Sequence, residues 1–234
     1  MFFTFAENGF MFEPLVFILL TLAAVPAGWM ILVYYRRHRM LLHLAHRLRL
    51  HFVGYDRTNM LGDWAGLYLM QLGHSGRAFN LIYGPWRNQQ VFVFDYCFET
   101  GSSQQRTGQR RNVVLWRLDN NLPALLALQE DFFEPLGKFR SFTRFITNDT
   151  DFDHRFHLFS DHPEVALALL SPALRRALMS CRDVNWELSG PNLVFFSEKL
   201  FSAVEISRWL TRSVRCCKLL VEASTGYDNS HGNY

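Results

Sequence analysis

The hydrophobic pattern opens with 21 uncharged residues, Leu15 to Tyr35, close to the N-terminus. At 1.5 Å per residue a helix of this length spans about 31 Å, which matches the hydrocarbon core of a bilayer. The pattern therefore predicts a transmembrane helix over residues 14–35, kinked at Pro26. A cleaved signal peptide is disfavoured because no positive charge precedes the run. The aromatic residues suited to anchoring at the membrane interface are Trp29, Tyr34 and Tyr35.

From residue 36 the apolar positions follow helical spacing and are separated by Arg and His. This spacing predicts a basic amphipathic helix over residues 36–52. Such a helix lies on an anionic membrane surface, where each nearby cation contributes about 1 kcal/mol. The histidines of this segment spread around the helix without a carboxylate, which favours headgroup contact over a metal site. The expected headgroup contacts are Arg36, Arg37, Arg39, Arg47 and Arg49.

After a glycine-containing connector the pattern changes to runs of aromatic and β-branched residues, which favour strands. The predicted strands are residues 77–83, 90–98, 111–118, 122–128, 155–160, 184–188 and 192–197. The first two are joined by a turn built on Gly84 and Pro85, and the last two form a hairpin around Ser189-Gly190-Pro191. The predicted helices are one near residues 63–72, one over 163–180 that breaks at Ser171-Pro172, and one over 203–221, with a helix or turn at 132–139. The fold class is α+β, with an antiparallel sheet covered by helices in a domain of residues 53–222 and a polar tail over 223–234.

The net charge of +3 is unevenly distributed along the chain. Residues 1–35 carry −2, residues 36–51 carry +5, and the remainder is neutral. Because positive residues follow the apolar run, the positive-inside rule predicts an N-terminus outside and a domain in the cytoplasm, which in a bacterium places the helix in the inner membrane and the N-terminus in the periplasm. A neutral domain without a basic patch beyond the anchor argues against nucleic acid as a partner.

Residues 1–13 form a stub that is rich in phenylalanine. We expect these rings to contact a partner protein at the outer face, and lipid anchoring in the interface is the alternative. The rings belong to Phe2, Phe3, Phe5, Phe10 and Phe12.

The motifs that could carry catalysis or bind a metal are incomplete. Asp149, Asp151 and Asp153 have the spacing of a calcium loop, but its required glycine and glutamate positions hold other residues, so these acids are expected to start a strand. Ser75 does not fit the nucleophile elbow. The four cysteines form no C-x-x-C pair and are expected to be free thiols. The sequence therefore predicts no enzyme, no cofactor and no metal site.

The polar loop over residues 101–111 lacks the Lys-Ser/Thr pair of a phosphate-binding loop. Its basic residues are candidates for binding a lipid headgroup or an acidic partner, and both alternatives stay open. They are Arg106, Arg110 and Arg111.

Residues 60–200 resemble an uncharacterised bacterial family of membrane-anchored proteins, a domain of unknown function. The residues that carry the resemblance are Asn80, Gly84, Phe94-Asp95-Tyr96, Thr100-Gly101-Ser102, Asp151-Phe152, Phe156 and Pro163-Glu164. The family's loop often reads G-S-G followed by a basic residue, whereas this chain reads GSSQQ. The resemblance implies a fold and a membrane location but no reaction.

The sequence as a whole favours a non-enzymatic accessory subunit of an inner-membrane complex. Its expected partners are other subunits of that complex and membrane lipids. A photosynthetic or respiratory assembly is the predicted host. The alternative is a membrane-tethered sensor that binds a lipid headgroup or a small ligand.

Overall fold

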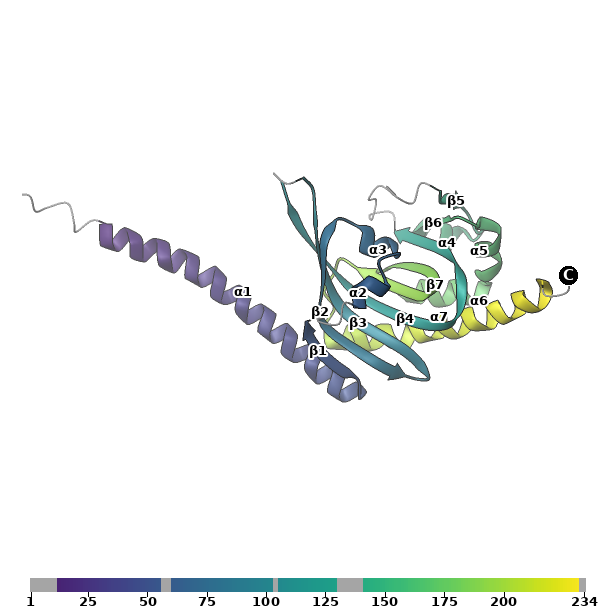
Figure 1. The fold of residues 1–234 in the computed structure, drawn as a ribbon, viewed down its shortest axis with the longest axis horizontal. Coiled ribbons are helices and arrows are strands. Elements are labelled where there is room, and N and C mark those ends of the chain that lie inside the picture. The colour runs from purple at the N-terminus through teal and green to yellow at the C-terminus, as the bar shows by residue number, and fades with distance from the viewer. Residues whose placement is uncertain (1–11, 56–59, 103–104, 130–140, 232–234) are drawn as a thin grey trace, which may run out of the picture. The chain divides into compact units, whose positions relative to one another are not determined.

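The computed structural model describes residues 12–55, 60–102, 105–129 and 141–231 (Figure 1). It divides into two compact units, the first ending at Leu41 and the second beginning at Leu42. The fold is α+β with an antiparallel sheet and one N-terminal helix apolar enough to cross a membrane. The predicted helix or turn at residues 132–139 lies outside the described residues.

Helix α1, Phe12–Leu48, is a single helix that includes Pro26. Its described apolar side chains before Arg36 are largely exposed, with Val25 at 72% and Ile31 at 70%. Both predicted segments form one helix, which ends four residues before the predicted limit at residue 52.

The end of α1 is a tight C-terminal cap. Arg49 takes a positive φ of 57°, and the amide of Leu50 donates to the carbonyl of Ala45 at 2.9 Å. The amide of Arg49 also donates to the carbonyl of His46, which completes a Schellman motif. The cap turns the chain into strand β1, His51–Tyr55.

The apolar stripe of the segment after residue 36 is covered by protein within the second unit. Leu44 and Ala45 are only 2% and 1% exposed. This part of α1 is amphipathic, as predicted, but its apolar face packs within the domain, and contact of its basic residues with the membrane surface stays a prediction. Burying these side chains in the domain removes the same apolar area from water as lipid would.

The sheet of the second unit has seven strands in the order β1-β2-β3-β4-β6-β5, with β7 paired to β4. All pairs are antiparallel. The remaining strands are β2 His74–Trp86, β3 Gln89–Thr100, β4 Thr107–Gln129, β5 Thr143–Phe145, β6 Phe156–Ser160 and β7 Asn185–Ser197.

The pairing of β2 with β3 is confirmed, but the predicted turn at Gly84 and Pro85 is wrong, because both residues lie within β2 and pair with β3. The turn is the pair Arg87-Asn88. Both residues have a positive φ, of 50° and 66°, which is the backbone of a type I′ turn. The predicted strands at 111–118 and 122–128 merge into the single long strand β4.

The predicted hairpin at Ser189-Gly190-Pro191 is wrong, because β7 runs through it as one strand. Gly190 has a φ of 55° and pairs with Leu122. Four residues of β4 between Arg117 and Leu122 lie opposite the single residue Pro191 of β7. The glycine and proline therefore accommodate a β-bulge instead of a turn.

The helices of the second unit are α2 Met60–Asp63, α3 Tyr68–Gln71, α4 Thr150–Arg155, α5 Pro163–Leu169, α6 Pro172–Ser180 and α7 Ala203–His231. The predicted break at Ser171-Pro172 is confirmed, and the Ser171 hydroxyl accepts from the amide of Leu174 at 3.3 Å. The predicted helix near 63–72 is two short helices, and α7 extends past the predicted end at 221 into the predicted polar tail.

The acids at 149–153 start helix α4, so the expected strand start there is wrong. Asp149 caps the helix by accepting from the amide of Phe152. Asp153 accepts from the amide of Thr147 at 2.9 Å. Short acidic side chains favour helix N-termini because they accept from free backbone amides.

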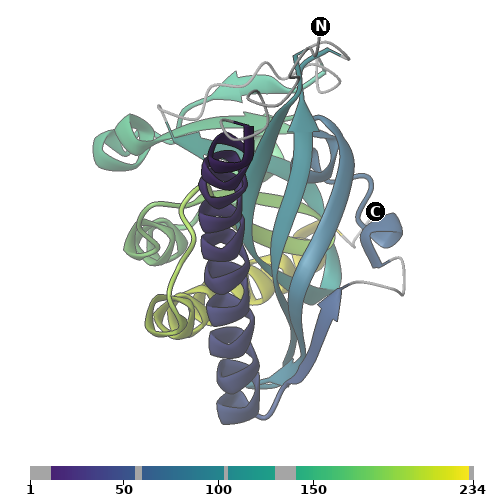
Figure 2. The ribbon, with the colours of Figure 1, turned by 90° about the vertical axis from the view of Figure 1, so that its left-hand side faces the viewer.

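Helices lie on both faces of the sheet (Figure 2), and buried apolar side chains pack between them and the strands. On one face Trp64, beside the short helices α2 and α3, stacks on Phe94 at a centroid distance of 5.5 Å. On the other face α7 covers β4, and the indole of Trp116 donates to the Ser213 hydroxyl at 2.9 Å. Side chains alternate along a strand, so neighbouring residues of β4 enter different cores.

A buried carboxylate joins β7 to the segment that covers the first core. Glu187 accepts from the amides of Tyr68 and Leu69, at 2.6 and 3.3 Å. Burial raises the pKa of Glu187 to about 7, although both amide hydrogen bonds oppose the shift. The carboxyl group therefore titrates near neutral pH while it caps the start of α3.

We expect Glu187→Gln to change the pH dependence of stability. The folded pKa of Glu187, about 7, lies above the ordinary 4.5, so its contribution is full below pH 4.5 and is lost as the pH rises through 7. Between pH 5 and 8 the wild-type free energy of unfolding should fall, relative to the variant, by about 3 kcal/mol. Denaturant unfolding of the detergent-solubilised chain measures this difference. Exposed Glu164→Gln is the control, and equal pH slopes for all three proteins would refute the assignment.

Candidate functional site

A shallow cavity of about 550 Å³ lies at the ends of β2, β3 and β4. Register pairs Arg77 with Cys97 and Cys97 with Arg110, so these three side chains share one face of the sheet. We call it the arginine cavity; its lining residues are Ser75, Arg77, Phe79, Cys97, Phe98, Glu99, Arg106, Gly108, Gln109 and Arg110.

The arginine cavity is built on a fully buried carboxylate, Asp95 of β3. One carboxylate oxygen accepts from Arg110 at 2.7 Å and from the amide group of Asn80 at 3.0 Å. The other accepts from the side chain of Asn112 at 3.1 Å. These hydrogen bonds compensate the burial of the charge and hold Arg110 at the cavity wall.

The other two arginines of the cavity are exposed. Arg106 lies 3.4 Å from Glu99, and such an exposed ion pair contributes little to stability. Arg77 forms no ion pair or hydrogen bond within the described part of the chain. Three arginines line the cavity, and two carboxylates, Asp95 and Glu99, lie beside them. The remaining positive charge favours an anionic ligand.

The groups at the rim of the arginine cavity do not form a nucleophilic relay. The same ring nitrogen of His74, Nδ1, lies 3.2 Å from the Ser75 hydroxyl and 3.7 Å from Glu99. A Ser-His-acid relay needs the two different ring nitrogens for these contacts. Burial raises the pKa of the Cys97 thiol, Arg110 opposes the shift and Asp95 adds to it. Burial therefore disfavours a nucleophilic role for the Cys97 thiol.

The structure separates the three arginines predicted around the polar loop. Arg106 and Arg110 line the arginine cavity. The side chain of Arg111 is only 3% exposed, bonds Glu198 at 2.8 Å and lies over the ring of Phe98. Arg111 is therefore not accessible as a surface contact, whereas a binding role for the other two stays a prediction.

The predicted membrane residues are exposed along α1. Trp29, Tyr34 and Tyr35 are between 46% and 64% exposed. Arg36 and Arg39 are also exposed, and Arg37 is half-buried. Their contacts with lipid stay predictions. Phe2, Phe3, Phe5 and Phe10 lie outside the described residues, as does the side chain of Phe12.

The last two predicted headgroup contacts lie in the second unit. Arg47 donates to the Ser207 hydroxyl of α7 at 2.9 Å. Arg49 takes the positive φ that ends α1. Arg47 therefore also connects α1 to α7, a role that its sequence position does not reveal.

The buried cysteines belong to the core. Cys181, Cys216 and Cys217 are fully buried, and burial raises the pKa of the Cys217 thiol. A lipid-modified or reactive role for the pair Cys216-Cys217 is therefore disfavoured.

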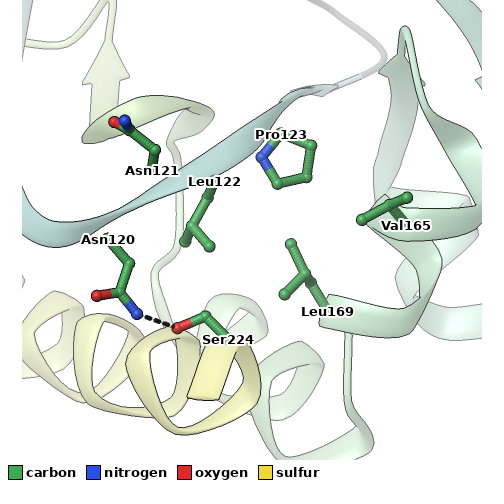
Figure 3. A pocket seen from close by; sticks show the side chains of 7 residues that line it. All are labelled: Asn120, Asn121, Leu122, Pro123, Val165, Leu169 and Ser224. Atoms are coloured by element: carbon green, nitrogen blue, oxygen red, sulfur yellow. Dashed lines mark hydrogen bonds between the residues drawn. The ribbon is translucent and has the colours of Figure 1, made fainter. Parts of the chain in front are cut away.

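A second cavity, of about 360 Å³, lies between the bulge of β4 and the helices α5 and α7 (Figure 3). Leu122 and Leu169 form part of its apolar wall, and Asn120 donates to the Ser224 hydroxyl at 2.6 Å beside them. None of its lining residues is titratable. Among the described residues no group of three or more His, Cys, Asp or Glu side chains is placed to hold a metal ion.

Sequence comparisons give no relative: no family model matches the chain, and no curated protein is similar to it in sequence. The resemblance carried by the F-D-Y and T-G-S motifs thus gains no support from family models. Among solved structures, the mycobacterial trehalose monomycolate transport factor A, TtfA, is similar with a TM-score of 0.61 and 12% sequence identity. The match covers 78% of this chain and 93% of that chain. At this identity the likeness shows a shared fold.

Replacement of Arg110 should destabilise the domain, because it leaves the buried Asp95 without its counter-charge. We expect Arg110→Met to lower the free energy of unfolding by about 3 kcal/mol at pH 7. Arg106→Met, which removes an exposed pair, is the matched control and should cost less than about 1 kcal/mol. Denaturant unfolding of the solubilised chain compares the two variants. Equal losses would show that Arg110 does not neutralise Asp95.

Proposed function

We propose that this protein is a membrane-tethered, non-enzymatic accessory protein of a membrane assembly. The observation that carries the proposal is α1, whose 21 residues from Leu15 to Tyr35 hold no charge and whose apolar side chains are largely exposed. A helix with this composition is stable in lipid and would expose a large apolar surface in water. The positive residues that follow it orient the domain toward the cytoplasm.

The arginine cavity supplies the docking element of this proposal. Arg77 and Arg106 are exposed at the end of three strands, and Arg110 is held in place from below by Asp95. Guanidinium groups bind carboxylates through paired hydrogen bonds, and the fixed position of Arg110 reduces the side-chain entropy lost on binding. An acidic segment of a partner subunit fits this charge.

The fold similarity favours a membrane transport assembly as the host. TtfA is described as a trehalose monomycolate transport factor, and its fold corresponds to 78% of this chain. The predicted photosynthetic or respiratory host has no comparable support, so a transport assembly replaces it here.

A second candidate function is the binding of a small anion in the same cavity. The unpaired guanidinium of Arg77 favours it, and a volume of about 550 Å³ is within the range of small-molecule sites. In this alternative the protein is a tethered sensor. Purified chain, free of partners, would then bind the anion.

Charge reversal in the arginine cavity should release the partner. The full-length tagged chain, solubilised in mild detergent, is expected to run in native gels with a larger complex. Arg77→Glu combined with Arg106→Glu should lower partner recovery by at least about tenfold, because like charges would then face the acidic segment. Arg176→Glu, an exposed change on α6, should leave recovery unchanged.

Two outcomes would refute the proposal. One is a wild-type chain that migrates as a free monomer in several mild detergents. The other is a complex that both variants retain equally, which would remove the arginine cavity from the interface. Tight binding of a small anion by the purified chain would instead support the sensor.

A further inference from the structure

The exposed face of α7 carries a basic stripe, which we define as Arg208, Arg212, Arg215 and Lys218. All four side chains are exposed, whereas Leu210 and Cys217 on the opposite side of the helix are buried. At 100° per residue the four cations lie within an arc of about 120°. No acid occurs between Ile206 and Val221. The neutral net charge of the domain therefore conceals one cationic face.

A groove at the start of the basic stripe combines positive charge, hydroxyl groups and an apolar wall. Its volume is about 400 Å³. Arg47 approaches from the end of α1, in the same unit, and donates to Ser207 at 2.9 Å. Val204 is 53% exposed at its edge. The lining residues are Arg47, Val204, Ser207, Arg208, Thr211 and Arg212.

The charge of the groove is only partly balanced by its neighbours. Glu205 is an acid of α7 beside the groove, and its carboxylate accepts from the amide and hydroxyl of Ser202 at 2.8 and 2.7 Å. It keeps its negative charge, so the three arginines that line the groove exceed it by two. Arg212 donates to the carbonyl of Ser180 at 2.8 Å, which leaves its charge uncompensated. Arg208 forms no hydrogen bond or ion pair with another described residue, although Glu205 attracts it.

The position of the groove in the chain favours a membrane lipid as the source of the anion. Arg47 follows Tyr35, the end of the uncharged run, by 12 residues. Even a fully extended chain of that length spans only about 40 Å. If the run crosses the bilayer, headgroups are therefore always near the groove, at a high effective concentration. An exposed Val204 beside the arginines suits the glycerol and upper acyl atoms of a phospholipid.

We propose that this groove binds the phosphate of an anionic phospholipid, and that the basic stripe of α7 lies along the leaflet that follows the anchor. The proposal rests on the membrane anchoring stated under the proposed function, and it adds a lipid class and a membrane-facing surface of the domain. Each cation near an anionic leaflet strengthens binding about fivefold, so the stripe and Arg47 act together.

Photocrosslinking of the full chain in proteoliposomes tests the proposal. Val204 is replaced by benzoylphenylalanine, and the vesicles contain phosphatidylcholine with either alkyne-tagged phosphatidylglycerol or alkyne-tagged phosphatidylcholine. We expect at least about fivefold more crosslinking to the anionic lipid, and a loss of this preference in Arg47→Gln/Arg208→Gln. The same photoprobe at Leu167 of α5, and Arg176→Gln in the Val204 background, are the matched controls.

The vesicles contain no partner protein, so the crosslinking result does not depend on whether the chain binds a partner. Resistance to alkaline extraction reports the anchoring separately. Equal labelling of both lipids, or labelling that Arg47→Gln/Arg208→Gln leaves unchanged, would overturn the proposal. Competition by millimolar inorganic phosphate would reassign the groove to a soluble anion, and competition by polyuridine RNA would reassign it to nucleic acid.

Discussion

The pairing of β4 on both of its edges is the constraint on which the rest of the domain depends. Between Asn112 and Arg117 it pairs with β3 on one edge and with β7 on the other. From Leu125 to Ala127 it pairs with β7 on one edge and with β6, in place of β3, on the other. Because β4 has no free edge in these stretches, a substitution there affects the strands on both of its edges. Its side chains alternate between the two faces of the sheet, so they determine which elements pack on each face.

The same pairing explains why the candidate site lies at one end of the sheet. Asp95 lies directly opposite Asn112 of β4, so the polar cluster is held by the ladder and not by a loop. Its charge is tolerated because Arg110, two residues before Asn112, reaches back to it from the cavity wall. Arg110 thus both compensates the buried carboxylate and lines the arginine cavity.

Several elements could be predicted because a local rule agrees with the fold. Runs of aromatic and β-branched residues predict the strands β2 and β3 although not the residues of their turn, and Ser171-Pro172 predicts the break between α5 and α6. The errors arise where pairing overrides local preference. Gly190 and Pro191 resemble a turn but lie opposite the bulge of β4, and Arg49 adopts a backbone conformation that usually requires glycine. For the site, an acid within the apolar run of β3 was a visible signal, whereas the approach of Arg77 and Arg110 depends on strand register.

The net charge is a poor guide to the surface, because charges that cancel in the total lie on different faces of the folded domain. The residues after 51 are neutral in total, and on that basis a basic patch was not expected beyond the anchor. In α7, however, the 3.6-residue period places Arg208, Arg212 and Arg215 on one face, where they outnumber the acid Glu205. A tethered domain samples the nearby membrane continuously, so even a modest cationic face has a large effect on how it is held. The distribution of charge over each helix face, and not its total, therefore decides which side of such a domain faces the bilayer.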